Sequence, residues 1–118
     1  YYEPTIFDEV KDDYTIMKVE PFGPLVPILS FKSFDEIIER ANNNDLGLCS
    51  YICTNSMEKA HRASELMESG TVAVNTPLVA LAEAPFGGIK QTGYGREGGS
   101  MAIKDYLNIK YTHLGLKG

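Results

Sequence analysis

Hydrophobic residues recur along this chain with two different spacings. Four segments have the length and apolar character of β-strands: residues 5–10, 25–31, 48–54 and 71–75. Two further segments, which begin at Ser33 and Ser56, place apolar residues three and four positions apart, as on one face of an α-helix. Through the middle of the chain the pattern therefore predicts strand, helix, strand, helix, strand.

The two predicted helices carry start and stop signals. Ser33 and Glu36 form a capping box, in which the serine side chain accepts from the Glu36 amide and the glutamate side chain accepts from the Ser33 amide. The three asparagines at 42–44 mark the end of this helix. The second helix begins after Ser56 and is expected to end at Gly70, at the C′ position that glycine favours.

Strands that alternate with helices favour right-handed crossovers, so we expect an α/β fold with a largely parallel βαβαβ sheet and flanking helices. Ligands of such sheets lie beyond the carboxyl ends of the strands, where Asn75 and the loop 76–83 would emerge. Residues 100–106 are predicted to form a short helix and residues 107–114 a closing strand. The sequence offers this last strand no partner, and an unpaired apolar edge invites pairing with another chain.

Residues 84–99 hold six of the eleven glycines, together with Pro85 and Phe86 as apolar anchors. Glycine adopts positive φ freely and lets two backbones approach closely, so we expect a shaped, ordered loop here. Within it, residues 93–98 match the G-x-G-x-x-G pattern of dinucleotide-binding turns. The context disfavours such a Rossmann turn, because no hydrophobic strand directly precedes it and only Asn108 and a cationic, aromatic strand follow.

Composition narrows the function classes. The chain has 118 residues, of which 43% are hydrophobic and 23% charged, as in one soluble globular domain. A net charge of -5 provides no basic stripe, so neither nucleic acid nor an anionic membrane surface is an expected partner. Apolar runs are far shorter than the roughly 20 residues that cross a bilayer, so a cytoplasmic protein is expected. The start at Tyr1, without a methionine, suggests a piece of a longer protein.

Cysteine and histidine positions predict neither a disulfide nor a metal site. Cys49 and Cys53 lie four apart on one face of a predicted strand, too far along it for a disulfide of ordinary geometry. We expect both thiols to be reduced and structural. Together with His61 and His113 they lack the spacing of zinc ligands, so no bound metal is expected.

Four motifs occur in a fixed order. They are Glu20-Pro21-Phe22-Gly23-Pro24; Ala41-Asn42-Asn43 with Leu46-Gly47-Leu48; Gly70-Thr71-Val72 with Val74-Asn75; and Pro85-Phe86-Gly87-Gly88 with Lys90 and Gly93-x-Gly95-Arg96-Glu97. The set resembles the C-terminal segment of the aldehyde dehydrogenase superfamily. This resemblance covers essentially the whole chain, but only the last part of a much longer enzyme.

The resemblance implies an NAD(P)-dependent parent enzyme that oxidises an aldehyde to the carboxylic acid. The family's cysteine nucleophile and glutamate base lie upstream of this segment, so the chain holds no catalytic residue and is expected to be inactive alone. Glu20 matches the glutamate that accepts hydrogen bonds from the nicotinamide-ribose hydroxyls, and Phe22 matches the aromatic beside that ribose. Phe86 matches a ring near the mouth of the aldehyde tunnel. From the residues alone, Glu20 is a solvated loop acid and Phe86 a core side chain.

The resemblance also divides the chain into residues 1–98, the C-terminal portion of the catalytic domain, and residues 99–118, a short helix and an oligomerisation strand. Residues 107–114 resemble the strand that family members donate to a neighbouring subunit, which implies a dimer or tetramer. Asn108 stands where many members carry a glutamate that pairs with arginines, including the one that matches Arg96.

The succinate-semialdehyde dehydrogenase type is the most similar subgroup, on Asn75-Thr76, Gln91-Thr92-Gly93, Arg96-Glu97-Gly98 and Asp105-Tyr106-Leu107. In that subgroup a serine before the Pro85 motif usually binds the substrate carboxylate, but Ala80 occupies the aligned position here. A semialdehyde is therefore only one candidate substrate.

A free-standing α/β binding or oligomerisation module without catalysis is the alternative function. The reading frame upstream of Tyr1 distinguishes the two, because only the enzyme needs a glycine-rich cofactor turn, a glutamate base and a cysteine nucleophile there. NAD and NADP both remain open, since the adenosine-ribose pocket would lie outside this segment.

Overall fold

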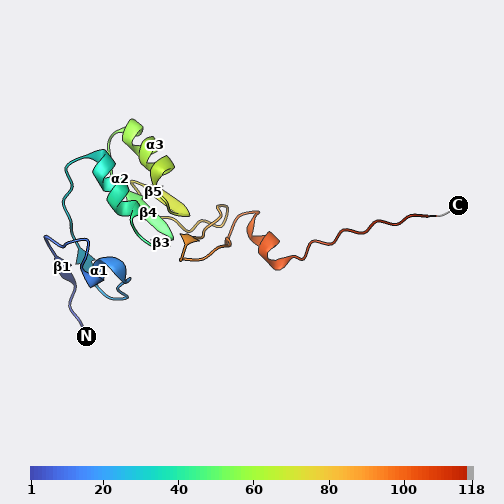
Figure 1. Cartoon of the computed structure of the whole chain (residues 1–118), viewed down its shortest axis with the longest axis horizontal. Helices are drawn as coiled ribbons and strands as arrows, with labels where there is room; N and C mark the ends of the chain where they lie inside the picture. The colour runs from blue at the N-terminus through green and yellow to red at the C-terminus, as the bar shows by residue number, and fades with distance from the viewer. Residues whose placement is uncertain (117–118) are drawn as a thin grey trace. The chain divides into compact units, whose positions relative to one another are not determined.

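A computed structural model describes residues 1–116 as short strands joined by helices and loops. In chain order the elements are β1 (Thr5–Phe7), α1 (Thr15–Lys18), β2 (Leu25–Pro27), α2 (Phe34–Asn42), β3 (Leu46–Gly47), β4 (Cys49–Ile52), α3 (Met57–Leu66), β5 (Thr71–Val74), β6 (Ile89–Lys90) and the 3₁₀ helix η1 (Ala102–Tyr106) (Figure 1). They fall into two compact units, Tyr1–Asn44 and a second that begins at Asp45.

The first unit is built on a parallel strand pair. β1 pairs with β2, with Thr5 opposite Leu25 and Phe7 opposite Pro27. Both strands are shorter than predicted. β1 ends before Glu9, whose φ of 52° is left-handed and cannot continue a strand, so the ladder with β2 ends at Phe7 and Pro27.

Helix α2 begins as its sequence predicts. The Ser33 side chain accepts from the Glu36 amide at 3.2 Å. The Glu36 carboxylate accepts from the amide of Lys32 at 2.8 Å, one residue before the partner that a capping box predicts. At the other end, Asn43 is the C-cap, so the asparagine run does end the helix.

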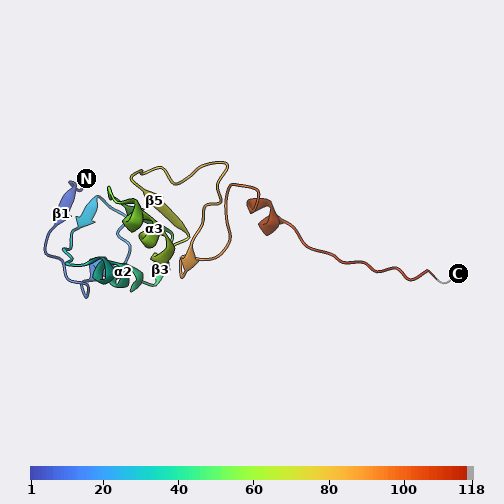
Figure 2. The same cartoon turned by 90° about the horizontal axis from the view of Figure 1, so that it is seen from above.

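The second unit contains the predicted parallel crossover. β4 and β5 run parallel, with Cys49 opposite Thr71 and Ile52 opposite Val74. Helix α3 connects them, and both views draw it beside β5 (Figure 1, Figure 2). The α/β class with parallel strands and helices is confirmed. The sheet itself is divided, however, because the described residues form three two-stranded sheets: β1 with β2, β4 with β5, and the antiparallel pair β3 with β6.

The end of α3 corrects one prediction. Its C-cap is Met67 in an extended conformation, so the helix ends before Gly70. Gly70 is required for a different reason: an added Cβ would lie only 1.9 Å from the carbonyl oxygen of Gly87. The start of β5 and the glycine-rich loop thus approach each other more closely than any side chain permits.

Little apolar surface is buried within the described residues. The buried hydrophobic side chains are those of Val10, Ala60, Ala63 and Ala73. Met57 and Leu66, which the helical pattern places toward a core, are 72% and 45% exposed. The chain thus leaves most of its large apolar side chains in contact with solvent.

The C-terminal segment differs from its prediction. The expected helix at 100–106 is the short 3₁₀ helix η1, and residues 107–116 have no strand assignment and are exposed throughout. A strand needs a ladder partner, and residues 1–116 provide none for this segment. The last two residues of the predicted 99–118 segment lie outside the described residues. In the described part of the chain, no helix is long and apolar enough to cross a membrane.

Candidate functional site

Glu20 and Phe22 share a compact turn between α1 and β2. The Val19 amide donates to the Thr15 carbonyl oxygen at 2.9 Å, which closes α1 just before Glu20. On the other side of the turn, the Thr5 amide donates to the Pro24 carbonyl oxygen at 2.8 Å. Two prolines, Pro21 and Pro24, restrict the backbone between these anchors. The turn is therefore fixed at both of its ends.

Both side chains of this turn face solvent. Phe22 is 96% exposed, and Glu20 is exposed as well. Within residues 1–116 the Glu20 carboxylate has no hydrogen-bond or ion-pair partner. An ionised carboxylate only accepts hydrogen bonds, and its two oxygens can accept from two neighbouring hydroxyl groups at once. The turn thus presents a two-oxygen acceptor and an aromatic ring to solvent.

A network of ionic hydrogen bonds lies in the same unit. Arg40, on α2, donates through Nε and Nη2 to the two carboxylate oxygens of Asp12, both at 3.0 Å. Its Nη1 donates to the Ser30 carbonyl oxygen at 2.8 Å and to Glu36 Oε1 at 3.2 Å. The Asp12 hydrogen bonds raise the pKa of Arg40. The pKa of Glu36 is lowered, first by the hydrogen bond from the Lys32 amide and then by Arg40.

The glycine-rich loop is ordered by contacts with distant residues. Phe86 and Glu97 exchange two backbone hydrogen bonds, both of 2.7 Å, across the loop. Thr92 Oγ1 accepts from the Gly47 amide at 2.8 Å, and Gly93 and Gly95 each have a φ of 104°. The prediction of a shaped loop with positive φ angles is confirmed. The strand before residues 93–98 is the two-residue β6, which is antiparallel to β3, so the geometry is not that of a Rossmann turn.

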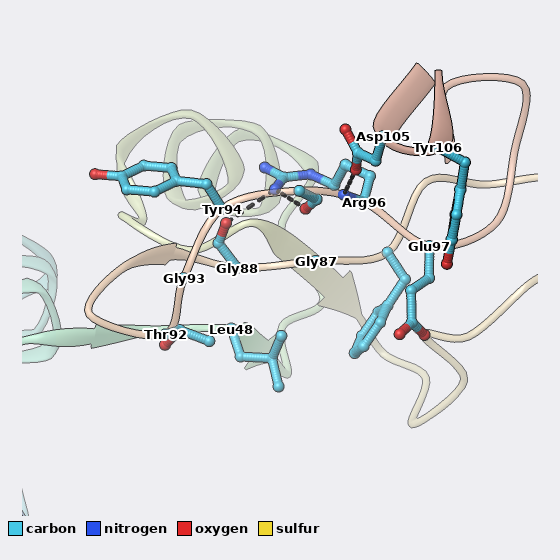
Figure 3. A pocket seen from close by; sticks show the side chains of 12 residues that line it. Leu48, Gly87, Gly88, Thr92, Gly93, Tyr94, Arg96, Glu97, Asp105 and Tyr106 are labelled. Atoms are coloured by element: carbon cyan, nitrogen blue, oxygen red, sulfur yellow. Dashed lines mark hydrogen bonds between the residues drawn. The ribbon is translucent and has the colours of Figure 1, made fainter. Parts of the chain in front are cut away.

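A cavity of about 320 Å³ lies along this loop, and we call it the loop cavity. Its lining includes Leu48, Phe86, Tyr94, Arg96, Glu97 and Tyr106 (Figure 3). Arg96 Nη1 donates to the carbonyl oxygens of Gly88 at 2.9 Å and Gly95 at 2.7 Å, so the guanidinium braces the loop from within. The Arg96 amide donates to Asp105 at 2.9 Å, which ties η1 to the loop (Figure 3).

The structure brings only one of the two residues expected in the substrate pocket to the loop cavity. Phe86 is half-buried and lines it, whereas Ala80 is exposed on the loop after β5 and is not part of the lining. That loop does leave the carboxyl end of β5, next to the parallel end of β4, as predicted. Asn75, with a φ of 55°, joins these ends: its side chain accepts from the Thr54 amide at 2.9 Å and donates to the Thr54 carbonyl oxygen at 2.8 Å.

The two cysteines and the possible metal ligands lie as follows. Cys49 is half-buried and Cys53 exposed, and both thiols are free. The exposure of Cys53 differs from the burial expected of a structural cysteine, because Cys53 lies beyond the end of β4. Among residues 1–116, no group of three or more histidine, cysteine or acidic side chains could hold a metal ion.

Sequence reasoning missed the Asp12–Arg40 pair. The two residues are 28 positions apart and belong to no shared motif, so no local spacing marks them. The Thr92–Gly47 hydrogen bond, across 45 positions, was missed for the same reason. Asp105 was noted only as part of a subgroup motif, and its bond to the Arg96 amide has no sequence signal of its own.

Comparisons with known proteins show which proteins this chain is similar to. The sequence model of the aldehyde dehydrogenase family matches residues 1–112. Mitochondrial succinate-semialdehyde dehydrogenase of Arabidopsis thaliana is 44% identical over 98% of this chain and 22% of its own length. Human retinal dehydrogenase 2 is 46% identical over 93% of the chain and 21% of its own length.

Solved structures match equally well. An aldehyde dehydrogenase from Bacillus cereus in complex with NAD+ superposes with a TM-score of 0.93, at 43% identity, over 99% of this chain and 24% of its own. An NADP-dependent enzyme from E. coli gives 0.92 at 40% identity, over 98% of this chain and 24% of its own. The chain thus spans about a fifth to a quarter of the length of the proteins it matches. On the sequence match and on these structures, the chain belongs to the aldehyde dehydrogenase family.

Proposed function

We propose that the protein containing this chain is an NAD(P)-dependent enzyme that oxidises an aldehyde to the carboxylic acid, and that Glu20 and Phe22 orient its nicotinamide ribose. The observation that carries the second part is the exposed Glu20 carboxylate, which has no partner within residues 1–116, on the same restrained turn as the exposed Phe22 ring. Membership of the family supports the first part. When bound, NAD(P)+ supplies the hydride acceptor.

Glu20 contributes orientation. Its two oxygens would accept hydrogen bonds from the two ribose hydroxyls, and Phe22 would pack against the ribose and the attached ring. Hydrogen bonds to a charged group contribute about 1.5–3 kcal/mol. These hydrogen bonds would hold the hydride acceptor within reach of the substrate carbon, which makes the transfer effectively intramolecular. Affinity for the cofactor depends largely on its adenosine half, and the residues that bind that half lie outside this segment.

At the substrate end, we assign Phe86 to the mouth of the aldehyde tunnel and Ala80 to the pocket wall. Ala80 offers no side-chain donor to a substrate carboxylate. Identity does not separate the substrates either, because the succinate-semialdehyde and retinal enzymes match at 44% and 46%. Succinic semialdehyde is the substrate to test first, with retinal as its apolar counterpart. NAD+ and NADP+ are both candidates, since the structural relatives include users of each.

Assembly and domain limits belong to the same proposal. Residues 107–114 form the strand given to a neighbouring subunit, and residues 1–98 form the catalytic-domain portion. Exposed apolar side chains along the strand, such as Ile109 at 101%, support this.

The isolated chain is inactive, because the nucleophile and base belong to the upstream part, and the reaction uses no metal. A cytoplasmic location stays a prediction, because the Arabidopsis relative is named as mitochondrial.

The test uses the full-length protein that contains this chain. We expect aldehyde-dependent reduction of NAD+ or NADP+, none from the isolated 118 residues, and a ten- to hundredfold slower hydride step in Glu20→Gln, which is about 1.5–3 kcal/mol. Single-turnover kinetics with deuterated aldehyde isolates that step. If the full-length protein reduces neither cofactor but still assembles through 107–114, the non-catalytic module is the better account.

A further inference from the structure

We infer that Arg40 is a positioning residue for the Glu20 turn, acting by fixing both ends of the segment that carries Glu20 and Phe22. The inference rests on the function proposed for Glu20. It extends that function to a residue that touches neither cofactor nor substrate, on a helix that follows the turn in sequence.

The geometry places Arg40 across this segment. Asp12 lies between β1 and α1, before the turn, and Ser30 lies after β2, beyond the turn. Arg40 bonds to both, with two bonds of 3.0 Å to the Asp12 carboxylate and one of 2.8 Å to the Ser30 carbonyl oxygen. One planar guanidinium therefore bridges the two ends of residues 12–30, next to the backbone bond from the Val10 amide to the Ile28 carbonyl oxygen.

The guanidinium is itself held in place. Glu36, one helical turn earlier on α2, accepts from Arg40 Nη1 at 3.2 Å and is anchored in turn by the Lys32 amide at 2.8 Å. The Arg40 side chain is only 26% exposed, so its orientation is partly shielded from solvent. Arginine suits this task because its donors form a rigid fork, whereas lysine offers a point charge on a flexible stem.

The exit and the entry of the turn are restrained differently. The exit has strand support, because β2 follows Pro24 directly and the Thr5 amide bonds to the Pro24 carbonyl oxygen. The entry passes through the single-turn helix α1. Before α1, the Val10 amide donates to the Ile28 carbonyl oxygen at 3.3 Å, and the Asp12 side chain ties the same loop to α2. Loss of the Arg40 fork therefore loosens the entry between Val10 and α1, while the strand pair and α2 remain, which allows the Glu20 carboxylate to shift.

Such a shift predicts a specific kinetic change. Partly exposed ion pairs contribute little to stability, so removal of this one should leave the protein folded. A misplacement of about 1 Å, by contrast, can slow a reaction about a hundredfold. We expect Arg40→Lys in the full-length protein to slow the single-turnover hydride step about tenfold and to increase its deuterium kinetic isotope effect. Cofactor affinity and Tm should change little.

Two comparisons separate positioning from general damage. Arg62→Lys makes the same substitution on the exposed face of α3 and should leave the hydride step unchanged. In the double variant Arg40→Lys/Glu20→Gln, the rate should equal that of Glu20→Gln alone, because both changes act through the same hydrogen bonds. Asp12→Asn, which keeps one acceptor oxygen, should give a smaller loss of the same kind.

The outcomes are distinct. A hydride rate in Arg40→Lys equal to that in Arg62→Lys, or fully multiplicative losses in the double variant, would overturn the role of Arg40 while the function of Glu20 stands. If Arg40→Lys fails to fold, Asp12→Asn decides by the same two criteria. If Glu20→Gln itself leaves the hydride step unchanged, the proposed function fails first and the inference falls with it.

Discussion

Replacement of Gly70 by alanine tests the closest backbone approach in the second unit. An added Cβ would lie 1.9 Å from the Gly87 carbonyl oxygen, 2.8 Å from its carbonyl carbon and 2.9 Å from the Gly88 Cα. All three neighbours are backbone atoms, so no flexible side chain can move aside. The φ of Gly70 lies outside the left-handed region, so the substitution introduces a steric conflict without added backbone strain.

The magnitude follows from these distances. Ordinary van der Waals contact begins at 3.4 Å, so the Gly87 oxygen would have to move by about 1.5 Å. Overpacking of this kind costs about 1–3 kcal/mol, and the stiffer unfolded chain of an alanine variant offsets less than about 1 kcal/mol of it. We therefore expect Gly70→Ala to lower the Tm, and to move the loop that carries Phe86.

The assay is thermal unfolding of the full-length protein together with hydrogen exchange of residues 84–99. Gly115→Ala is the matched control, because nothing lies within 4 Å of its added Cβ and its φ is not left-handed. That control should change stability by less than about 0.5 kcal/mol. Equal Tm and equal exchange of residues 84–99 in the two variants would refute the close approach of Gly70 and Gly87.

Substitutions at three further positions have expected outcomes. Asn75→Ala should destabilise the protein by about 2–3 kcal/mol, because it loses two hydrogen bonds to Thr54 and keeps a left-handed φ. Asn75→Gly relieves the backbone strain and should therefore lower the Tm less than Asn75→Ala does. The folded-state pKa of Glu36 is lowered from 4.5, so its stabilisation is present above about pH 4.5 and is lost as the pH falls through the folded-state pKa; Glu36→Gln should make Tm less dependent on pH in that acid range. Ile109→Pro should shift the assembly toward monomer in sedimentation, unless residues 107–114 form no intersubunit ladder.

Local signals predicted the helices well. Ser33 and Ser56 are the N-caps of α2 and α3, and their side chains accept from the amides three residues on. Such signals operate within a few residues, so one sequence contains all of the information. The parallel pairing of β4 with β5 was predictable for a similar reason, because one helix of ordinary length connects them.

Long-range contacts were less accessible. The role of Gly70 depends on Gly87, and the place of Arg40 depends on Asp12; no spacing in the sequence joins either pair. Gly70 was misassigned to a helix end because that is where an isolated glycine after a helix usually lies. Residues 107–114 alternate like a strand, but a strand forms only with a ladder partner, which residues 1–116 do not supply.

The candidate site divides in the same way. The motif around Glu20 predicted a rigid turn, and the structure shows one in which the carboxylate is exposed. The motif around Phe86 predicted an ordered loop, and the backbone bonds to Glu97 show how it is ordered. Ala80 came from alignment with a subgroup motif alone, and the structure places it outside the loop cavity.

A structure of the full-length protein with NAD+ or NADP+ bound would test the role of Glu20. The quantity to measure is the distance from each Glu20 carboxylate oxygen to the hydroxyl oxygens of the nicotinamide ribose. We expect two hydrogen bonds of about 2.5–3.0 Å, with the Phe22 ring against the same ribose. A ribose held by other residues, with the Glu20 carboxylate still facing solvent, would contradict it.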